Sequence, residues 1–215
     1  MTPQAFVELL GHVRASAILR TPVAEAAAPA MEAAIRGGFR IIEFTMTTPN
    51  VLELIERFSS SATYDGLVVG AGTVLTPADA RAAVGAGARF LVSPVVDEDV
   101  IAAAGELGVA MMPGTATPTE MLRAHRAGAP LQKLFPAPGI GPKFVRAVLG
   151  PMPFLRIVPT SGVHLNNARA YIDAGAHAVG FVNPLFDPNE LAGGQYDRVE
   201  ARAHRLLAAI DPAGL

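Results

Sequence analysis

The 215-residue sequence contains no cysteine and no tryptophan, and only two of its 17 basic residues, Lys133 and Lys143, are lysines. The absence of cysteine excludes disulfides and thiolate metal sites, and it fits a reducing cytoplasm. Charged residues make up only 17% of the chain and hydrophobic residues 51%, a balance that excludes intrinsic disorder. The formal net charge of −2, without a basic block, argues against a nucleic-acid partner.

Long hydrophobic runs are also missing. No apolar segment reaches the roughly 18 residues that a membrane-spanning helix needs. The N-terminal residues 1–16 are amphipathic, whereas a signal peptide has a charged region followed by an apolar one. We therefore expect a cytoplasmic protein without membrane contact. Its length suits one large domain, and we expect residues 1–215 to form it.

Glycine (21 residues) and proline (18) are abundant, and they separate the copies of one repeated unit. Short apolar segments alternate with Ala-rich helical segments that end in glycine, where a left-handed residue is wanted. The eight predicted strands cover residues 15–20, 39–45, 66–72, 89–94, 108–114, 131–136, 155–160 and 178–182. Continuously apolar strands between helices indicate a parallel sheet covered by helices.

Eight such units in a chain of this length predict an α/β fold of the (β/α)₈ TIM-barrel type. An extra N-terminal helix precedes the first predicted strand, and an amphipathic helix at 196–210 closes the chain. A doubly wound open sheet is the alternative. No G-x-G-x-x-G motif opens the first helix, and this absence argues against a dinucleotide-binding protein with such a sheet.

Three charged residues stand at or near the carboxyl ends of predicted strands, where TIM barrels place their active sites. Lys133 lies in the apolar segment "PLQKLFP", among Leu131, Leu134 and Phe135. Desolvation there would lower the pKa of the amine and make it nucleophilic. Lysine, unlike arginine, can lose its proton and form a Schiff base with a carbonyl.

The other two charges suit the same chemistry. Glu43 interrupts the apolar strand "FRIIEFT", and a carboxylate with a raised pKa serves proton transfer near neutral pH. Arg20 ends the first strand, and its planar fork can hold a substrate carboxylate. The structural alternative is that Glu43 and Lys133 are only a core ion pair, or that Arg20 pairs with Glu43.

The five histidines offer no metal site. His12, His125, His164, His177 and His204 lie on separate helices or at helix starts. None forms an H-x-H or H-x-x-H pair with a carboxylate. We expect no metal and no cofactor.

Several motifs, spread in order from about residue 15 to 186, carry a resemblance. They are "GGFRIIEFTMTTP", "VGAGTVLTP", "FLVSP", "MMPGTATPTE", "LQKLFPAPGIGPKFVRAVLGPMP" and "VPTSGVHLNN". Together they resemble the class I 2-keto-3-deoxy-6-phosphogluconate (KDPG) / 4-hydroxy-2-oxoglutarate (KHG) aldolase family. The resemblance implies an aldehyde-lyase built as a homotrimer of (β/α)₈ barrels. Such an enzyme splits a 2-keto-4-hydroxy acid into pyruvate and an aldehyde through a lysine Schiff base, without metal.

The resemblance also assigns residues. Lys133 of "KLFP" is the Schiff-base lysine, and Glu43 of "EFT" is the general acid/base. The family commonly has an arginine at the position of Thr47, and Arg20 at the end of the first strand takes its place. The substrate-binding residues implied are Arg20, Thr47, Thr73, Pro94, Pro113, Phe135, Thr160, Ser161, Gly162 and Asn183.

The phosphate end departs from the family pattern. T-G-G after the seventh strand here reads T-S-G, with Ser161 as the second residue. G-S after the eighth strand reads V-N, where Val182 and the neighbouring Phe181 would obstruct an anion and Asn183 could still donate an N–H. An unphosphorylated 2-keto acid is therefore an alternative substrate. A barrel that binds anionic metabolites without Schiff-base chemistry is the alternative from another class.

Overall fold

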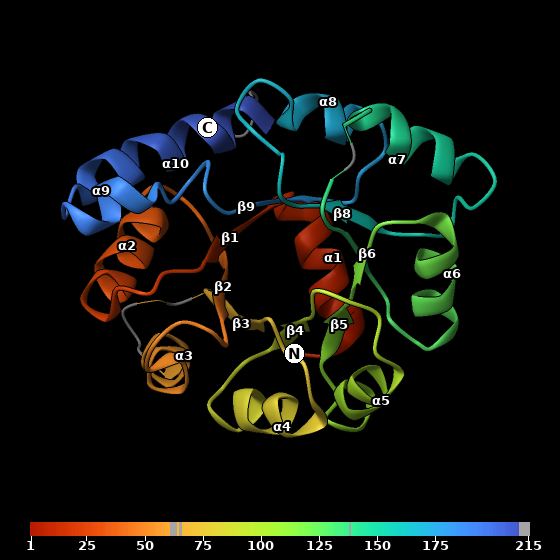
Figure 1. Ribbon diagram of the computed structural model, residues 1–215, viewed down its shortest axis with the longest axis horizontal. Helices are drawn as coiled ribbons and strands as arrows, with labels where there is room; N and C mark the ends of the chain where they lie inside the picture. The colour runs from red at the N-terminus through yellow and green to blue at the C-terminus, as the bar shows by residue number, and fades with distance from the viewer. Residues whose placement is uncertain (61–63, 65, 138, 211–215) are drawn as a thin grey trace.

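The computed structural model describes residues 1–60, 64, 66–137 and 139–210, in which parallel strands alternate with helices. The strands are β1 (Ala15–Leu19), β2 (Ile41–Thr45), β3 (Val68–Gly72), β4 (Phe90–Val92), β5 (Ala110–Met112), β6 (Gly114–Thr115), β7 (Gln132–Leu134), β8 (Ile157–Pro159) and β9 (Val179–Phe181). They form a six-stranded sheet in the order β5-β4-β3-β2-β1-β9 and a three-stranded sheet in the order β6-β7-β8. Figure 1 shows the strands of both sheets arranged around the middle of the molecule, an arrangement called the ring of strands below, with most helices outside them. The predicted α/β class with parallel strands is confirmed.

The helices follow the strands along the chain. They are α1 (Pro3–Val13), α2 (Ala24–Arg36), α3 (Val51–Ser60), α4 (Pro77–Gly85), α5 (Glu98–Glu106), α6 (Pro118–Arg126), α7 (Pro142–Leu149), α8 (Ala168–Asp173), α9 (Pro188–Ala192) and α10 (Tyr196–Ile210). The last one has the predicted bounds, whereas the short α9, capped by the side chain of Asp187, was not predicted. In the described part of the chain, no helix is both long and apolar enough to span a bilayer.

Local sequence signals explain where these helices begin and end. Thr76 and Thr117 each form a capping box with an acidic residue three positions later, which satisfies backbone N–H groups of the first turn. Gly38, Gly87 and Gly175 follow helices with φ values of 107°, 112° and 98°. The left-handed glycines that the sequence predicts after helices are therefore present.

The fifth predicted strand, residues 108–114, is divided at Pro113. β5 pairs with β4 before the proline, and β6 pairs with β7 after it. Proline has no N–H to donate to a ladder, so it interrupts a strand. Its carbonyl oxygen still accepts a hydrogen bond from the Lys133 backbone N–H at 2.9 Å. The division marks the place where one sheet gives way to the other.

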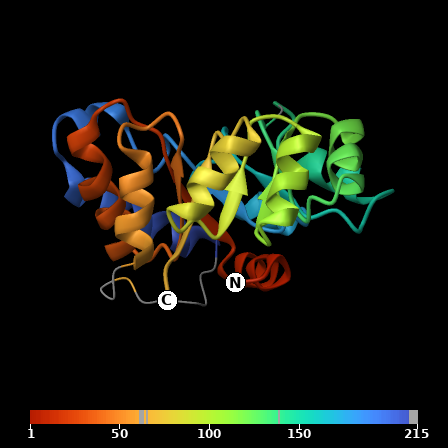
Figure 2. The same ribbon diagram turned by 90° about the horizontal axis from the view of Figure 1, so that it is seen from below.

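Two apolar clusters stabilise the fold. The larger one lies between the strands and the surrounding helices, and the smaller one lies inside the ring of strands. The smaller cluster includes Phe6, Val7 and Leu10 of α1, and the Phe6 ring stacks on Phe90 at 4.4 Å. Burial of such a side chain contributes about 1.5–3 kcal/mol. In Figure 2, α1 lies beneath the rest of the molecule, so it covers one end of the ring.

Candidate active site

Polar side chains gather at the end of the ring opposite α1. Apolar residues near the strand starts face inward, and two positions later the inward residue is polar. Ile41 is followed in this way by Glu43, Leu131 by Lys133, and Val158 by Thr160; the first residue of each pair belongs to the inner apolar cluster. Because side chains two apart on a strand share a face, these polar groups project into one space.

Lys133 and Glu43 meet inside that space. The lysine Nζ lies 4.0 Å from the glutamate Oε1, and both side chains are buried, at 8% and 1% exposure. Burial lowers the pKa of Lys133, opposed by the Glu43 charge and aided by Arg20. Burial likewise raises the pKa of Glu43, against the pull of Lys133 and Arg20. Both shifts favour the uncharged forms, which suit a nucleophilic amine and a proton-carrying carboxyl.

The Glu43 carboxylate occupies space that is free because residue 72 of the neighbouring strand β3 is a glycine. A Cβ at Gly72 would overlap Oε1 of Glu43 and approach its Cδ within 2.7 Å. Within the described residues, neither carboxylate oxygen has a hydrogen-bond partner. Buried carboxylates are ordinarily satisfied, so these oxygens remain available to a bound substrate or water.

A cavity of about 530 Å³ opens beside Lys133. Six of the predicted substrate-binding residues line it together with the lysine: Arg20, Phe135, Thr160, Ser161, Gly162 and Asn183. The Lys133 Nζ lies 5.3 Å from the centre of the Phe135 ring. The structure therefore brings Lys133, the exposed guanidinium of Arg20 and the loop residues 160–162 together around one cavity.

The remaining four predicted residues do not line this cavity. Pro94 lines a neighbouring cavity of about 320 Å³, which shares Phe135 with the first. Pro113 is buried between β5 and β6, and Thr73 follows β3 with a left-handed φ of 57°. Thr47 is exposed, and its hydroxyl lies 3.0 Å from that of Thr45.

Strand geometry corrects two details of the sequence interpretation. Leu134 and Phe181 belong to the outer cluster between strands and helices, and the Phe181 ring meets Phe39 edge-on at 6.1 Å. Neither side chain therefore surrounds the Lys133 amine or obstructs the cavity. Leu134 is adjacent in sequence to Lys133, and successive strand residues point to opposite faces. Val182, in contrast, does line the cavity.

Sequence reasoning missed three lining residues: Ile18, His164 and Pro184. His164 lies in the loop after β8, and its backbone N–H donates to Oδ1 of Asn167 at 2.7 Å. Asn167 in turn donates to the carbonyl of Gly162 at 2.9 Å. The position of His164 follows from this loop conformation, for which the sequence pattern carries no periodic signal.

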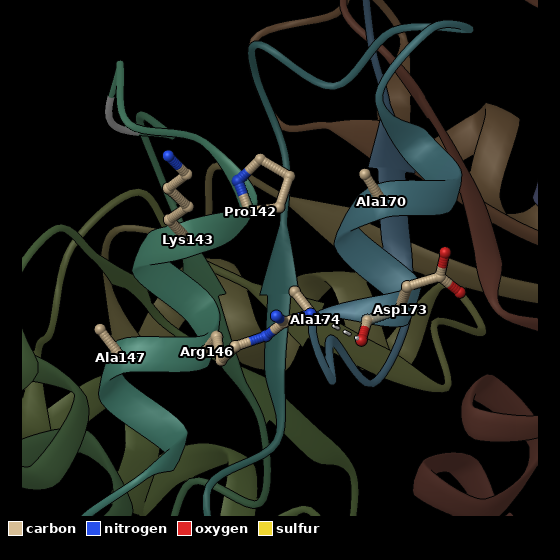
Figure 3. A pocket seen from close by; sticks show the side chains of 7 residues that line it. All are labelled: Pro142, Lys143, Arg146, Ala147, Ala170, Asp173 and Ala174. Carbon is tan, nitrogen blue, oxygen red and sulfur yellow. Dashed lines mark hydrogen bonds between the residues drawn. The ribbon is translucent and has the colours of Figure 1, made fainter.

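A second concave region lies on the outside of the molecule, between α7 and α8 (Figure 3). It measures about 450 Å³ and is lined by Pro142, Lys143, Arg146, Ala147, Ala170, Asp173 and Ala174. Arg146 reaches across it to the Asp173 carbonyl at 3.5 Å. Its charged side chains are exposed, whereas those of Lys133 and Glu43 are buried. Across the described ranges, no group of three or more metal-ligating side chains is present here or elsewhere.

The α/β fold thus places a buried amine, a buried carboxyl and an exposed guanidinium at the carboxyl ends of its parallel strands. The model of the KDPG and KHG aldolase family matches residues 8–202, and the chain belongs to that family.

Relatives and solved structures agree with this membership. The chain is 38% identical to a probable 2-dehydro-3-deoxy-6-phosphogalactonate aldolase of Rhizobium meliloti, over 91% of this chain and 90% of the relative. It is 33% identical to the 2-dehydro-3-deoxy-phosphogluconate aldolase of Treponema pallidum, over 94% and 96%. A native KDPGal structure superposes with a TM-score of 0.84 at 30% identity, covering 93% of this chain and 95% of that one.

One solved relative captures a reaction intermediate. It is the KDPG aldolase of Legionella pneumophila with pyruvate held as a covalent carbinolamine. This structure superposes with a TM-score of 0.79 at 25% identity, over 91% of this chain and 97% of that one.

Proposed function

We propose that this protein is a class I pyruvate aldolase that cleaves a 2-keto-4-hydroxy acid into pyruvate and an aldehyde. One observation carries the proposal: a buried amine, Lys133 Nζ, lines a cavity and lies 4.0 Å from the buried Glu43 carboxyl. Family membership supports the reaction class. The roles of the individual residues rest on the geometry and on the motifs.

In the proposed reaction, the neutral Lys133 amine attacks the C2 keto carbon and forms a carbinolamine. Loss of water, with the oxygen protonated by Glu43, gives the protonated imine. The carboxylate of Glu43 then accepts the C4 hydroxyl proton, the C3–C4 bond breaks, and its electron pair moves toward the imine nitrogen. The aldehyde leaves, and an enamine remains on Lys133. Protonation of C3 by Glu43 and hydrolysis of the imine release pyruvate.

The other predicted residues would hold the substrate. Arg20 binds the pyruvate carboxylate, because its guanidinium lines the same cavity as Lys133 and offers a bidentate fork. Phe135 covers the amine from one side. Thr47, Thr73, Pro94 and Pro113 are assigned to the pyruvate end from the family motifs. Thr160, Ser161, Gly162 and Asn183 would contact the aldehyde portion.

Reduction with borohydride tests the mechanism. The protein is incubated with pyruvate, reduced and digested, and its peptides are mapped by mass. We expect a stable pyruvate-derived adduct on Lys133 and none on Lys143. An unmodified Lys133 peptide after this treatment would refute the Schiff-base mechanism.

A substrate without phosphate is the second candidate, and Val182 in the cavity wall favours it. A valine side chain reduces the space in which backbone N–H groups could approach a phosphate. We expect kcat/KM for KDPG and for 4-hydroxy-2-oxoglutarate to differ less than tenfold. A large preference for KDPG would assign the phosphorylated substrate instead.

We also propose that residues 1–215 form one domain in which the two sheets close into a (β/α)₈ barrel with an extra N-terminal helix. Contact between β8 and β9, and the passage from β5 to β6 through Pro113, support closure. A cytoplasmic homotrimer is further proposed from the family resemblance, and exposed Ile140 and Phe154 offer apolar contact area. Light scattering after size exclusion measures the subunit number.

A further inference from the structure

A second, smaller cavity adjoins the proposed active site. It measures about 260 Å³ and is lined by His164, Leu165, Pro184, Arg202, Arg205 and Leu206. His164 and Pro184 also line the cavity that contains Lys133. These two residues therefore form the wall between the cavities, and the smaller cavity continues the space beyond the aldehyde end.

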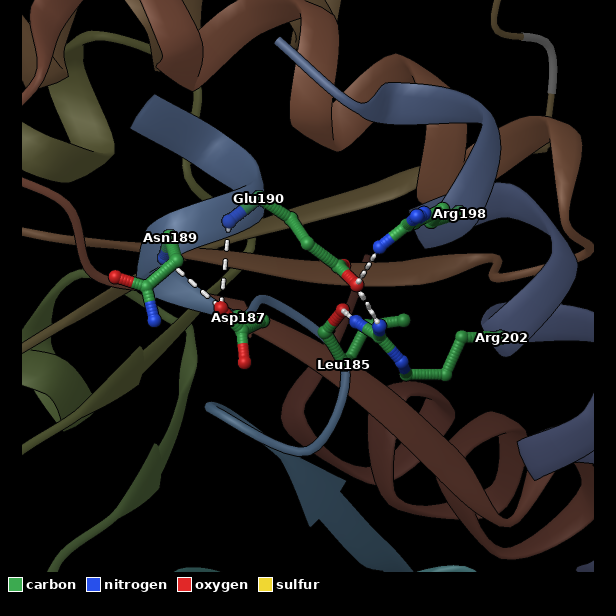
Figure 4. Close-up of polar contacts among 6 residues, drawn as sticks. All are labelled: Leu185, Asp187, Asn189, Glu190, Arg198 and Arg202. Atoms are coloured by element: carbon green, nitrogen blue, oxygen red, sulfur yellow. Dashed lines mark hydrogen bonds and ion pairs between the residues drawn. The ribbon is translucent and has the colours of Figure 1, made fainter. Parts of the chain in front are cut away.

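The two arginines of this cavity differ in their partners. Arg202 donates to both carboxylate oxygens of Glu190, at 2.7 and 2.6 Å, and to the Leu185 carbonyl at 2.9 Å. Arg198 contacts the same carboxylate at 3.7 Å, and Figure 4 shows the Glu190 side chain approached by both guanidinium groups. The charge of Arg202 is thus matched by a carboxylate.

Among the residues that the structure describes, Arg205 has no such carboxylate partner. It lies one turn after Arg202 on α10, is exposed, and makes no hydrogen bond or ion pair with any residue that the structure describes. Its guanidinium lines the cavity, and a guanidinium binds phosphate and carboxylate in a bidentate manner.

His164 supplies a second donor. Its backbone is held by Asn167 in the loop after β8, while its side chain is exposed and borders both cavities. A ligand that extends from Lys133 past Pro184 would meet the imidazole before it meets Arg205. Leu165 and Leu206 add apolar side chains to the lining of the smaller cavity.

We propose that this cavity, defined by His164 and Arg205, binds the anionic end of aldehydes longer than three carbons. The inference rests on the proposed aldolase function and deepens it by naming a substrate class: 2-keto-4-hydroxy acids with a long tail that ends in phosphate or carboxylate. The apolar residues of the cavity contact the carbon chain, and Arg205 and His164 bind the terminal anion. Short aldehydes do not reach Arg205.

The test measures aldol addition of pyruvate to matched aldehydes, in the wild type and in Arg205→Gln and His164→Ala variants. Erythrose and erythrose 4-phosphate form the phosphate pair, butanal and succinic semialdehyde form the carboxylate pair, and glyoxylate is the short reference. We expect Arg205→Gln to reduce the kcat/KM ratio of charged to uncharged aldehyde about tenfold in at least one pair. His164→Ala reduces the same ratio, and glyoxylate turnover in Arg205→Gln stays within twofold of the wild type. The pair that responds identifies phosphate or carboxylate as the terminal group.

Arg198→Gln is the matched control, because Arg198 lies on the same helix but does not line the cavity. It should leave every ratio unchanged. Exchange of the pyruvate methyl protons with solvent deuterium monitors the Schiff-base step separately. If exchange persists and Arg205→Gln changes neither ratio, the subsite is wrong while the aldolase proposal stands. If the wild type shows no exchange, the aldolase proposal itself fails.

Discussion

The two lysines of this chain occupy opposite environments. Lys133 lies inside the ring of strands and is buried, whereas Lys143 is exposed at the start of α7, in the concave region between α7 and α8. Both line concave regions of similar volume, about 530 and 450 Å³. Lys133 lies 4.0 Å from the buried carboxyl of Glu43, and burial lowers its pKa.

From this difference we infer that burial of the amine, and not the volume of the concave region, makes Lys133 the candidate nucleophile. A solvated ammonium keeps its proton near neutral pH and attacks no carbonyl. Removal of water from around Lys133 favours the neutral amine, and the nearby Glu43 keeps a proton acceptor within reach. The proposed active site is therefore the region in which burying a charge is costly.

Replacing each lysine by arginine should give the largest difference in activity between the two regions. Lys133→Arg keeps a positive charge but cannot form an imine, so we expect kcat to fall by at least about 10³-fold. Lys143→Arg should remain within twofold of the wild type. Pyruvate release from KDPG measures both, and circular dichroism controls for folding. Retained activity in Lys133→Arg would favour an anion-binding barrel without Schiff-base chemistry.

Glu43→Gln should have the next largest effect. The amide keeps the size of the side chain but cannot carry protons, so we expect kcat to fall about 10²–10⁴-fold. The Glu43 charge raises the pKa of Lys133, and its removal should lower that pKa further. The rate of borohydride trapping by pyruvate, measured against pH, should therefore rise at lower pH in the variant. A shift to higher pH would contradict the assigned electrostatics.

Gly72→Ala tests whether the absence of a side chain at residue 72 is required to position the Glu43 carboxylate. Because the added methyl overlaps the Glu43 carboxylate, we expect displacement of the acid/base and a loss in kcat of up to about 10²-fold. KM should change little, and the pH profile of kcat should shift with the new environment of Glu43. Gly85→Ala is the matched control, since a Cβ at that helix position meets nothing within 4 Å. A normal kcat and pH profile in Gly72→Ala would exclude the positioning role.

The smallest effect concerns stability. Burial raises the pKa of Glu43 from 4.5 and lowers that of Lys133 from 10.5, so both charged forms are penalised in the folded state. The glutamate penalty disappears below its ordinary pKa and the lysine penalty disappears above its own. At pH 7 both are present, and the double variant Lys133→Met/Glu43→Gln should be about 1–4 kcal/mol more stable than the wild type. Urea unfolding at pH 7 measures this, and a less stable double variant would show that the pair stabilises the fold.

Much of the architecture could be predicted from the sequence because periodic patterns report it directly. The α10 bounds, the glycines after helices and all eight strand positions follow from local apolar periodicity and capping residues. The short α9 was missed because one helical turn and a half carries too little pattern. The break at Pro113 was missed because a single proline in an apolar run can also lie at a strand edge.

The sequence by itself determined which residues carry the candidate chemistry. A lysine and a glutamate within apolar strands are costly to bury, and period-two alternation places them on the inner face. Only the tertiary structure decided that their atoms lie 4.0 Å apart, that Gly72 makes room for the carboxylate, and that His164 separates two cavities. Each of these contacts involves residues that are distant along the chain. Their geometry depends on strand register and loop conformation, which local sequence patterns do not predict.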